Sequence, residues 1–72
     1  MKLSNRLRVL RAEKEISQQT LADEVGISRQ TVNSIERGKF NPSVKTALKM
    51  AEYFGVAVED AFQLKEEEEK DG

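Results

Sequence analysis

The segment Gln18–Arg37 (QQTLADEVGISRQTVNSIER) constrains the fold more than any other part of this chain. Apolar residues recur at helical spacing on both sides of Gly26, which predicts two short helices joined by a tight turn. Gly26 suits that turn because a glycine adopts a positive φ without strain. Helices that cross at roughly 90–120° approach closely at one point, and Ala22 is small enough to lie there. We therefore predict steeply crossed helices over residues 18–25 and 29–37.

Each of these helices has its own start signal and its own apolar anchors. Ser17 and Ser28 precede them, and a serine hydroxyl at that position can accept a hydrogen bond from a first-turn N–H. The apolar side chains that can then meet across the turn are Leu21, Val25, Val32 and Ile35.

The remaining chain predicts three further helices, which we expect over residues 6–14, 44–54 and 58–62, with Asn5 and Ser43 capping the first two. On the longest of them a stripe at i, i+3, i+4, i+7, i+10 predicts the buried face: Val44, Ala47, Leu48, Ala51 and Phe54. Gly38 is expected to take a left-handed conformation after residue 37, and Pro42 disfavours helix at the residue before it. Phe40, in the loop between them, is expected to plug the edge of the core.

The ends of the chain are less constrained. Met1–Ser4 is either a frayed end or an edge strand, and Gln63–Lys65 is a candidate strand that could pair with it. Residues 66–72 (EEEEKDG) contain no apolar side chain and a run of like charges, which predicts a disordered acidic tail. We therefore expect one domain over residues 1–65, all-α, with a short two-stranded sheet if the ends pair.

Composition excludes several kinds of site. The chain has no cysteine and no histidine, so it lacks both a thiolate metal site and the commonest general base. Its acidic pairs, Asp23–Glu24 and Glu59–Asp60, are adjacent on predicted helices and do not face each other. No apolar run reaches the roughly 20 residues that span a membrane, and the start MKLSNRLRVLRAEKE is too charged for a signal peptide. We expect a cytoplasmic protein that is not an enzyme and has no cofactor, metal or small-molecule ligand.

Charge is divided unevenly along the chain, although the net charge is only −1. Residues 1–45 hold nine Lys or Arg against five Asp or Glu, whereas residues 46–72 hold three against eight. The basic part contains the predicted helix pair, and a local basic surface matters more for phosphate binding than the total charge. The net charge of −1 therefore does not argue against nucleic acid as a partner. The acidic tail is most simply a solubilising end, and the alternative is a mimic of DNA that competes for the basic surface.

The helix predicted over residues 29–37 has a polar outer face. Val32 and Ile35 point inward, so the outward residues are Arg29, Gln30, Asn33, Ser34 and Arg37. An α-helix fits the major groove of B-DNA, where Arg can bond guanine O6 and N7 while Gln or Asn can bond adenine N6 and N7. The alternative is an ordinary solvated helix face.

The wider stretch ISQQTLADEVGISRQTVNSIERGK resembles the XRE family, which includes the lambda and 434 phage repressors. The part SRQTVNSIERGKFNPS is similar to the small, stand-alone members of the type that represses cytolysin genes. The resemblance covers about Asn5 to Leu64. It implies a five-helix, lambda-repressor-like domain that reads double-stranded operator DNA through a helix-turn-helix. Such a protein regulates transcription, most simply as a repressor that blocks polymerase.

The resemblance also implies roles for single residues. Arg29 and Gln30 match the first two base-reading positions, and Ser34 matches a third. Ser34 is shorter than the Gln that phage repressors often carry there, so Asn33 beside it is the other candidate. The family places a matching Gln on a phosphate, and the expected phosphate contacts are Gln18, Ser28, Thr31, Arg37, Lys39 and Asn41. For Lys39 the alternative is a free surface lysine.

Arg11 is expected on the inner side of the first helix, one turn after Leu7, where an arginine needs a partner. We nominate Glu36, because an Arg and a Glu at the matching positions form a salt bridge in the XRE family. The alternative is that both side chains are independently solvated.

A homodimer is expected, because one helix reads too few base pairs to select a site from a genome. Its interface is expected at the C-terminal end, on Val56, Phe62 and Leu64, with Met1, Leu3 and Val9 nearby. The alternative is that these residues close a monomeric core. Two rival functions are the antitoxin of a toxin–antitoxin pair and a protein-interaction module on the same fold. The second would need an apolar outer face over residues 29–37, which this sequence lacks.

Overall fold

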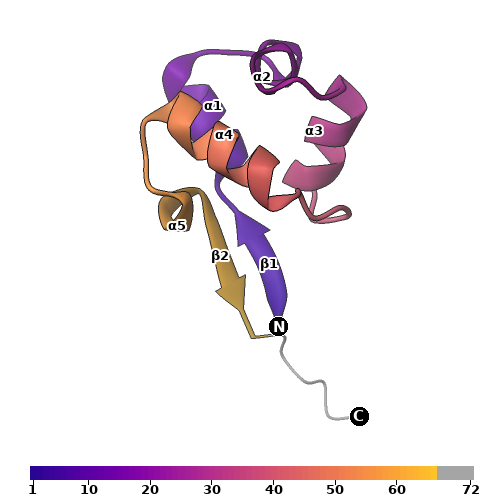
Figure 1. The fold of residues 1–72 in the computed structure, drawn as a ribbon, viewed down its shortest axis with the longest axis vertical. Helices are drawn as coiled ribbons and strands as arrows, with labels where there is room; N and C mark the ends of the chain where they lie inside the picture. Colours follow the sequence, from indigo (N-terminus) through magenta and orange to yellow (C-terminus); the bar gives the residue numbers. More distant parts are fainter. Residues whose placement is uncertain (67–72) are drawn as a thin grey trace.

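The computed structural model describes residues 1–66, which form five helices and a two-stranded sheet (Figure 1). The elements follow in the order β1 (Lys2–Asn5), α1 (Leu7–Lys14), α2 (Gln18–Val25), α3 (Arg29–Glu36), α4 (Val44–Phe54), α5 (Val58–Ala61) and β2 (Phe62–Lys65). The predicted five-helix domain is therefore confirmed, and the two ends of the chain do pair. None of the helices in this range is long and apolar enough to cross a membrane. The predicted acidic tail lies outside the described residues, apart from Glu66.

Serine hydroxyls cap three of the helices in the predicted places. The side chains of Ser17, Ser28 and Ser43 accept hydrogen bonds from backbone N–H groups in the first turns of α2, α3 and α4. At α1 the start differs from the prediction, because Asn5 is the last residue of β1 and the helix begins at Leu7. The Asn5 side chain still joins the elements, since Oδ1 accepts the Leu7 N–H at 3.1 Å and Nδ2 donates to the Ile35 carbonyl at 2.9 Å.

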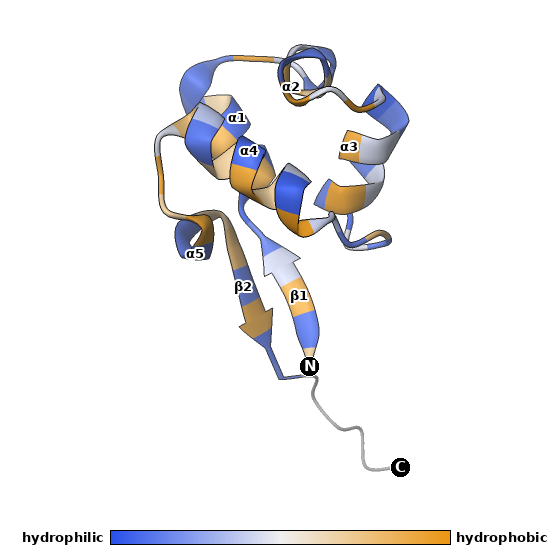
Figure 2. Ribbon diagram, in the orientation of Figure 1, coloured by the Kyte–Doolittle hydropathy of each residue, from blue (hydrophilic) through white to orange (hydrophobic). Residues whose placement is uncertain are grey.

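The core lies where α1, α2, α3 and α4 meet above the sheet, and each of these helices carries hydrophobic segments (Figure 2). Its buried side chains are Leu7, Leu10, Leu21, Ala22, Val25, Val32, Ile35, Met50, Ala51, Ala61 and Phe62. The four predicted anchors of the α2–α3 pair are all among them. Gly26 ends α2 with a φ of 81°, a left-handed conformation that a side chain would strain. The steep α2–α3 turn is thus fixed by both packing and backbone.

α4 buries a different stripe from the predicted one. The side that faces the core carries Ala47, Met50, Ala51 and Phe54. Val44 and Leu48, which were expected there, are 76% and 52% exposed. Helical spacing fits either stripe, because both repeat i, i+3, i+4, i+7 and they share Ala47, Ala51 and Phe54. The orientation of α4 about its own axis is set by what it packs against, and periodicity alone does not contain that information.

The sheet projects away from the helices at the end of the molecule opposite α2 (Figure 1). β1 and β2 are antiparallel, with Leu3 opposite Leu64 and Asn5 opposite Phe62. Phe62 is buried in the core of one chain, which the predicted interface did not allow for. Val56 is partly buried against the core, and its place in an interface stays a prediction. Only Leu64, at the distal part of β2, is largely exposed. Phe62 lies at the junction of α5 and β2, opposite Asn5, and its ring belongs to the core.

Candidate nucleic-acid interface

The outer face of α3 lies between α2 and the loop that leads to α4 (Figure 1). Residues on an α-helix advance by about 100° each, so Arg29, Asn33 and Glu36 fall on one side of it. Gln30 and Ser34 fall on the other side. We call these sides the α2 edge and the loop edge of α3. The two edges differ in the hydrogen bonds that their side chains make.

A buried ion pair between Arg11 and Glu36 lies beneath the α2 edge. Glu36 Oε2 accepts from Arg11 Nε at 2.6 Å, and Oε1 accepts from Arg11 Nη2 at 3.0 Å. The Glu36 side chain is fully buried, and that of Arg11 is 16% exposed. Arg11 Nη1 also donates to the Ile16 carbonyl at 3.2 Å. The predicted pair is therefore present as a two-point contact that ties α1 to the end of α3, and the reading of two independently solvated side chains is wrong.

Both partners of this pair are held in their charged forms. Burial raises the pKa of Glu36, but hydrogen bonds from Arg11 and Gln18 and the positive charges of Arg11 and Arg8 outweigh it, so the pKa lies below its ordinary value. The hydrogen bond and charge of Glu36 likewise raise the pKa of Arg11 against the effect of burial. The ion pair thus persists across the neutral pH range.

Gln18, the first residue of α2, links the ion pair to the surface. Its Nε2 donates to Glu36 Oε1 at 3.1 Å and to Asn33 Oδ1 at 3.1 Å. Its Oε1 accepts a longer hydrogen bond, 3.4 Å, from Arg29 Nη1. The chain of contacts therefore runs from Arg11 in the interior to Arg29 at the exposed start of α3.

These contacts add a second role to the one expected for Gln18. Its side chain bonds residues of α3, and the phosphate contact that the resemblance implies stays a prediction. The N-terminus of α2 lies at the same place, where first-turn N–H groups have no acceptor within the helix. Sequence reasoning missed the bonds that Gln18 makes. The signal was the spacing of Arg29, Asn33 and Glu36 at i, i+4, i+7, which places three polar side chains on one edge.

The loop edge borders an open hollow of about 290 Å³. It is lined by Gln30, Thr31, Ser34, Lys39 and Phe40. The ring of Phe40 is 54% exposed, so the prediction that it plugs the edge of the core is wrong. The reason is the way α3 ends: Lys39 N–H donates to the Ser34 carbonyl at 2.9 Å, and Gly38 N–H to the Ile35 carbonyl at 3.0 Å. With Gly38 at a φ of 75°, this closure keeps the following residue beside the outer face of α3.

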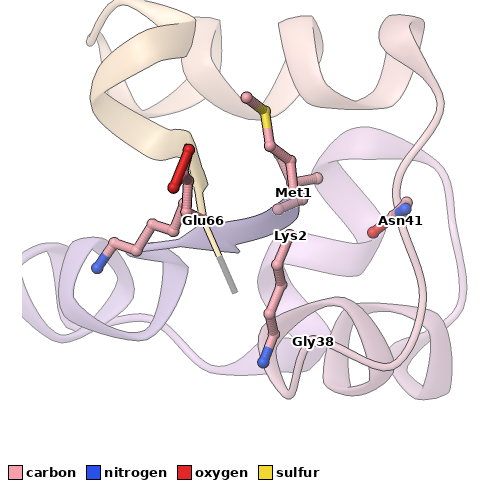
Figure 3. A pocket seen from close by; sticks show the side chains of 7 residues that line it. Met1, Lys2, Gly38, Asn41 and Glu66 are labelled. Carbon is pink, nitrogen blue, oxygen red and sulfur yellow. The ribbon is translucent and has the colours of Figure 1, made fainter. Parts of the chain in front are cut away.

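The other phosphate candidates divide between two sides of the molecule. Ser28 and Thr31 lie at the start of α3, where their hydroxyls are 2.8 Å apart. Arg37 is exposed and lines a shallow depression beside β1. Asn41 borders a hollow of about 600 Å³ together with both strand ends, across from Glu66 (Figure 3). Thr31 and Lys39 line one hollow beside the outer face of α3, and the phosphate contacts expected of all these residues stay predictions.

Comparison with known proteins agrees with this geometry. Residues 7–60 match the helix-turn-helix family. An uncharacterized HTH-type transcriptional regulator of Methanocaldococcus jannaschii is 44% identical over 92% of this chain and 100% of its own length. The uncharacterized HTH-type transcriptional regulator YgzD of Bacillus subtilis is 43% identical over 90% of this chain and 98% of its own.

A solved structure shows the same fold. The restriction-modification controller protein C.AhdI from Aeromonas hydrophila superposes with a TM-score of 0.70 at 39% identity, over 75% of this chain and 82% of its own. The family match, over residues 7–60, includes the whole α2–α3 pair. The chain therefore belongs to the XRE-type helix-turn-helix family.

Proposed function

We propose that this protein is a sequence-specific regulator of transcription that reads the major groove of double-stranded DNA with α3. The observation that carries the proposal is the α2 edge, where Arg29 and Asn33 are exposed or half-buried and bonded to Gln18. Polar side chains held at a helix surface suit the bonding edges of base pairs. A protein-interaction module would need an apolar face there.

Contacts to DNA follow from the chemistry of each group. Arg29 is the candidate for guanine, and Gln30 and Asn33 are the candidates for adenine. Lys39 and the N-terminus of α2 are the candidates for phosphates on either side, and such contacts position a protein without reading bases. Occupying a promoter in this way blocks polymerase without any second activity, so we propose repression. The names of the two relatives, both called HTH-type transcriptional regulators, support a role in regulating transcription.

We further propose that the protein acts as a homodimer. Leu64 is 67% exposed and Met1 is 82% exposed, and the alternation of β-strands places both on the face of the sheet that carries Leu3. A second copy covering this face would bury apolar surface that is otherwise in water. In a two-fold dimer the two α3 helices would lie roughly 34 Å apart, one turn of DNA.

Selection of bound duplexes from random DNA tests the proposed function. We expect enriched sites with two inverted half-sites about one helical turn apart. Enrichment of a single short site would contradict the dimer, and no enrichment at all would contradict sequence-specific binding.

Sedimentation equilibrium at micromolar concentration tests the interface. The wild type should sediment at twice the 8.2 kDa mass of one chain, and Leu64→Lys should sediment as one chain. Leu48→Lys, on the exposed stripe of α4, is the matched control and should leave the dimer intact. A dimer that survives Leu64→Lys but not Leu48→Lys would assign the interface to α4.

A further inference from the structure

Phe40 is an exposed aromatic ring within a polar surface. Single exposed apolar residues are common on proteins, but this one shares its hollow with Gln30 and Ser34, two of the candidate base-reading residues. The other side chains that line the hollow are those of Thr31 and Lys39. The ring is thus the one large apolar group among the lining residues.

The backbone that carries the ring is held against the end of α3. The hydrogen bonds from Lys39 N–H to the Ser34 carbonyl and from Gly38 N–H to the Ile35 carbonyl fold the loop back against the end of the helix. Phe40 follows directly, and Pro42 restricts the chain shortly after it. When α3 enters a groove, the ring enters with it.

The major groove offers one apolar group to such a ring, the 5-methyl group of thymine. A thymine pairs with an adenine, whose N6 and N7 are the partners that a glutamine bonds in two places. Phe40 and Gln30 border the same hollow, so they are placed to bind the two halves of one A·T pair or of neighbouring pairs.

We propose that Phe40 is a specificity-determining residue, whose ring contacts the 5-methyl group of a thymine in each half-site. The proposal rests on the proposed function, because it requires α3 to lie in the major groove. It adds a base-contacting residue that lies outside α3. It also gives the loop edge a preference for thymine over cytosine, which lacks the methyl group.

Replacing thymine by uracil removes only that methyl group and leaves base pairing unchanged. Duplexes selected by the wild type are made with deoxyuridine at one thymine position at a time. Their affinities are measured at fixed salt for the wild type, Phe40→Ala and Phe40→Leu. Leu48→Ala, which changes an apolar residue of α4 that is 52% exposed against 54% for Phe40, is the matched control.

The wild type should lose about fourfold in affinity at one thymine position of a half-site, the effect of one buried methyl group. Phe40→Ala should bind the unmodified site more weakly by a similar factor and should be indifferent to uracil there. Phe40→Leu should keep part of the sensitivity, and it serves as the test variant if Phe40→Ala melts at a clearly lower temperature. Leu48→Ala should behave as the wild type.

The proposal is wrong if uracil is tolerated at every position by the wild type, or if Phe40→Ala keeps the full penalty for uracil. It is also wrong if Phe40→Ala weakens binding to random DNA as much as to the selected site, because the ring would then touch the sugar–phosphate backbone. A wild type that selects no site refutes the proposed function itself, and with it the thymine contact.

Discussion

The two edges of α3 are held in different ways. On the α2 edge, Asn33 and Arg29 bond to Gln18, and Gln18 bonds to a buried ion pair. On the loop edge, the side chains of Gln30 and Ser34 make no hydrogen bond within residues 1–66, and they border an open hollow beside an exposed ring. The side chains of the α2 edge are held by contacts within the protein before DNA binds. Those of the loop edge are ordered only by contacts with DNA.

The difference predicts a division of labour in binding. Immobilising a flexible side chain at an interface costs about 0.5–1.5 kcal/mol, and part of this cost is already met on the α2 edge. That edge should therefore contribute a fixed base preference. The loop edge should contribute contacts that form with the complex and adapt to it.

The largest expected effect is on stability, from breaking the ion pair beneath the α2 edge. Arg11→Ala leaves a fully buried carboxylate without its cation and should lower the free energy of unfolding by about 3 kcal/mol. Glu36→Ala should cost less, because the remaining Arg11 is 16% exposed and can reach water. The double variant should lose clearly less than the sum of the two, as measured by urea denaturation. Strictly additive losses would show that the pair does not act as a unit.

A smaller effect is expected from Gln18→Ala, which disconnects the surface from the ion pair. Affinity for the selected site should fall by about 1 kcal/mol while affinity for random DNA changes little. Gln19→Ala is the matched control. Gln19 follows Gln18 directly, and its exposed side chain bonds Asp23 at 2.9 Å, away from α3. Fluorescence anisotropy titrations at fixed salt compare the two variants on the selected site and on random DNA. Equal losses for the two variants would contradict the organising role of Gln18.

Lys39→Ala should weaken binding less, and equally for all sequences. A lysine on phosphate contributes to non-specific affinity, so the slope of log K against log salt should shrink by roughly one unit. Titrations of selected and random duplexes at several salt concentrations give both slopes. An unchanged slope would make Lys39 a free surface residue.

The smallest expected effect is a change of stability with pH. The pKa of Glu36 is lower in the folded protein than its ordinary value of 4.5, so its ionised form stabilises the fold above that pH. This contribution should be lost as the pH falls below about 4.5 and through the lower folded value. Urea denaturation between pH 3 and 7 should show a shallower decline for Glu36→Gln than for the wild type. Parallel curves would mean that Glu36 titrates normally.

Local signals were sufficient to predict the α2–α3 pair. A serine cap and a glycine delimit α2, and the same pair of signals delimits α4, so the bounds of both helices agree with the prediction. Such signals act over a few residues and can be read from the sequence directly. The same holds for the outward position of Arg29 and Gln30.

Features that depend on distant contacts were not predictable in this way. Which stripe of α4 is buried depends on its neighbours in space, and so does the burial of Phe62. Phe40 was misplaced because hydrophobicity favours the core, whereas the closure at Gly38 holds the residue at the surface. The Arg11–Glu36 pair came from family resemblance, and its extension through Gln18 was visible only in the structure.

The central claim is that the outer face of α3 reads bases, and Arg29→Ala tests it most directly. Arg29 is exposed at the start of α3 and is the outermost member of the α2 edge. The measurement is the ratio of affinities for the selected site and for random DNA, in the wild type and in Arg29→Ala at one salt concentration. We predict that the variant loses about 1–3 kcal/mol on the selected site alone and accepts other bases at one or two positions. An equal loss on both duplexes would make Arg29 a phosphate contact and contradict base reading by this face.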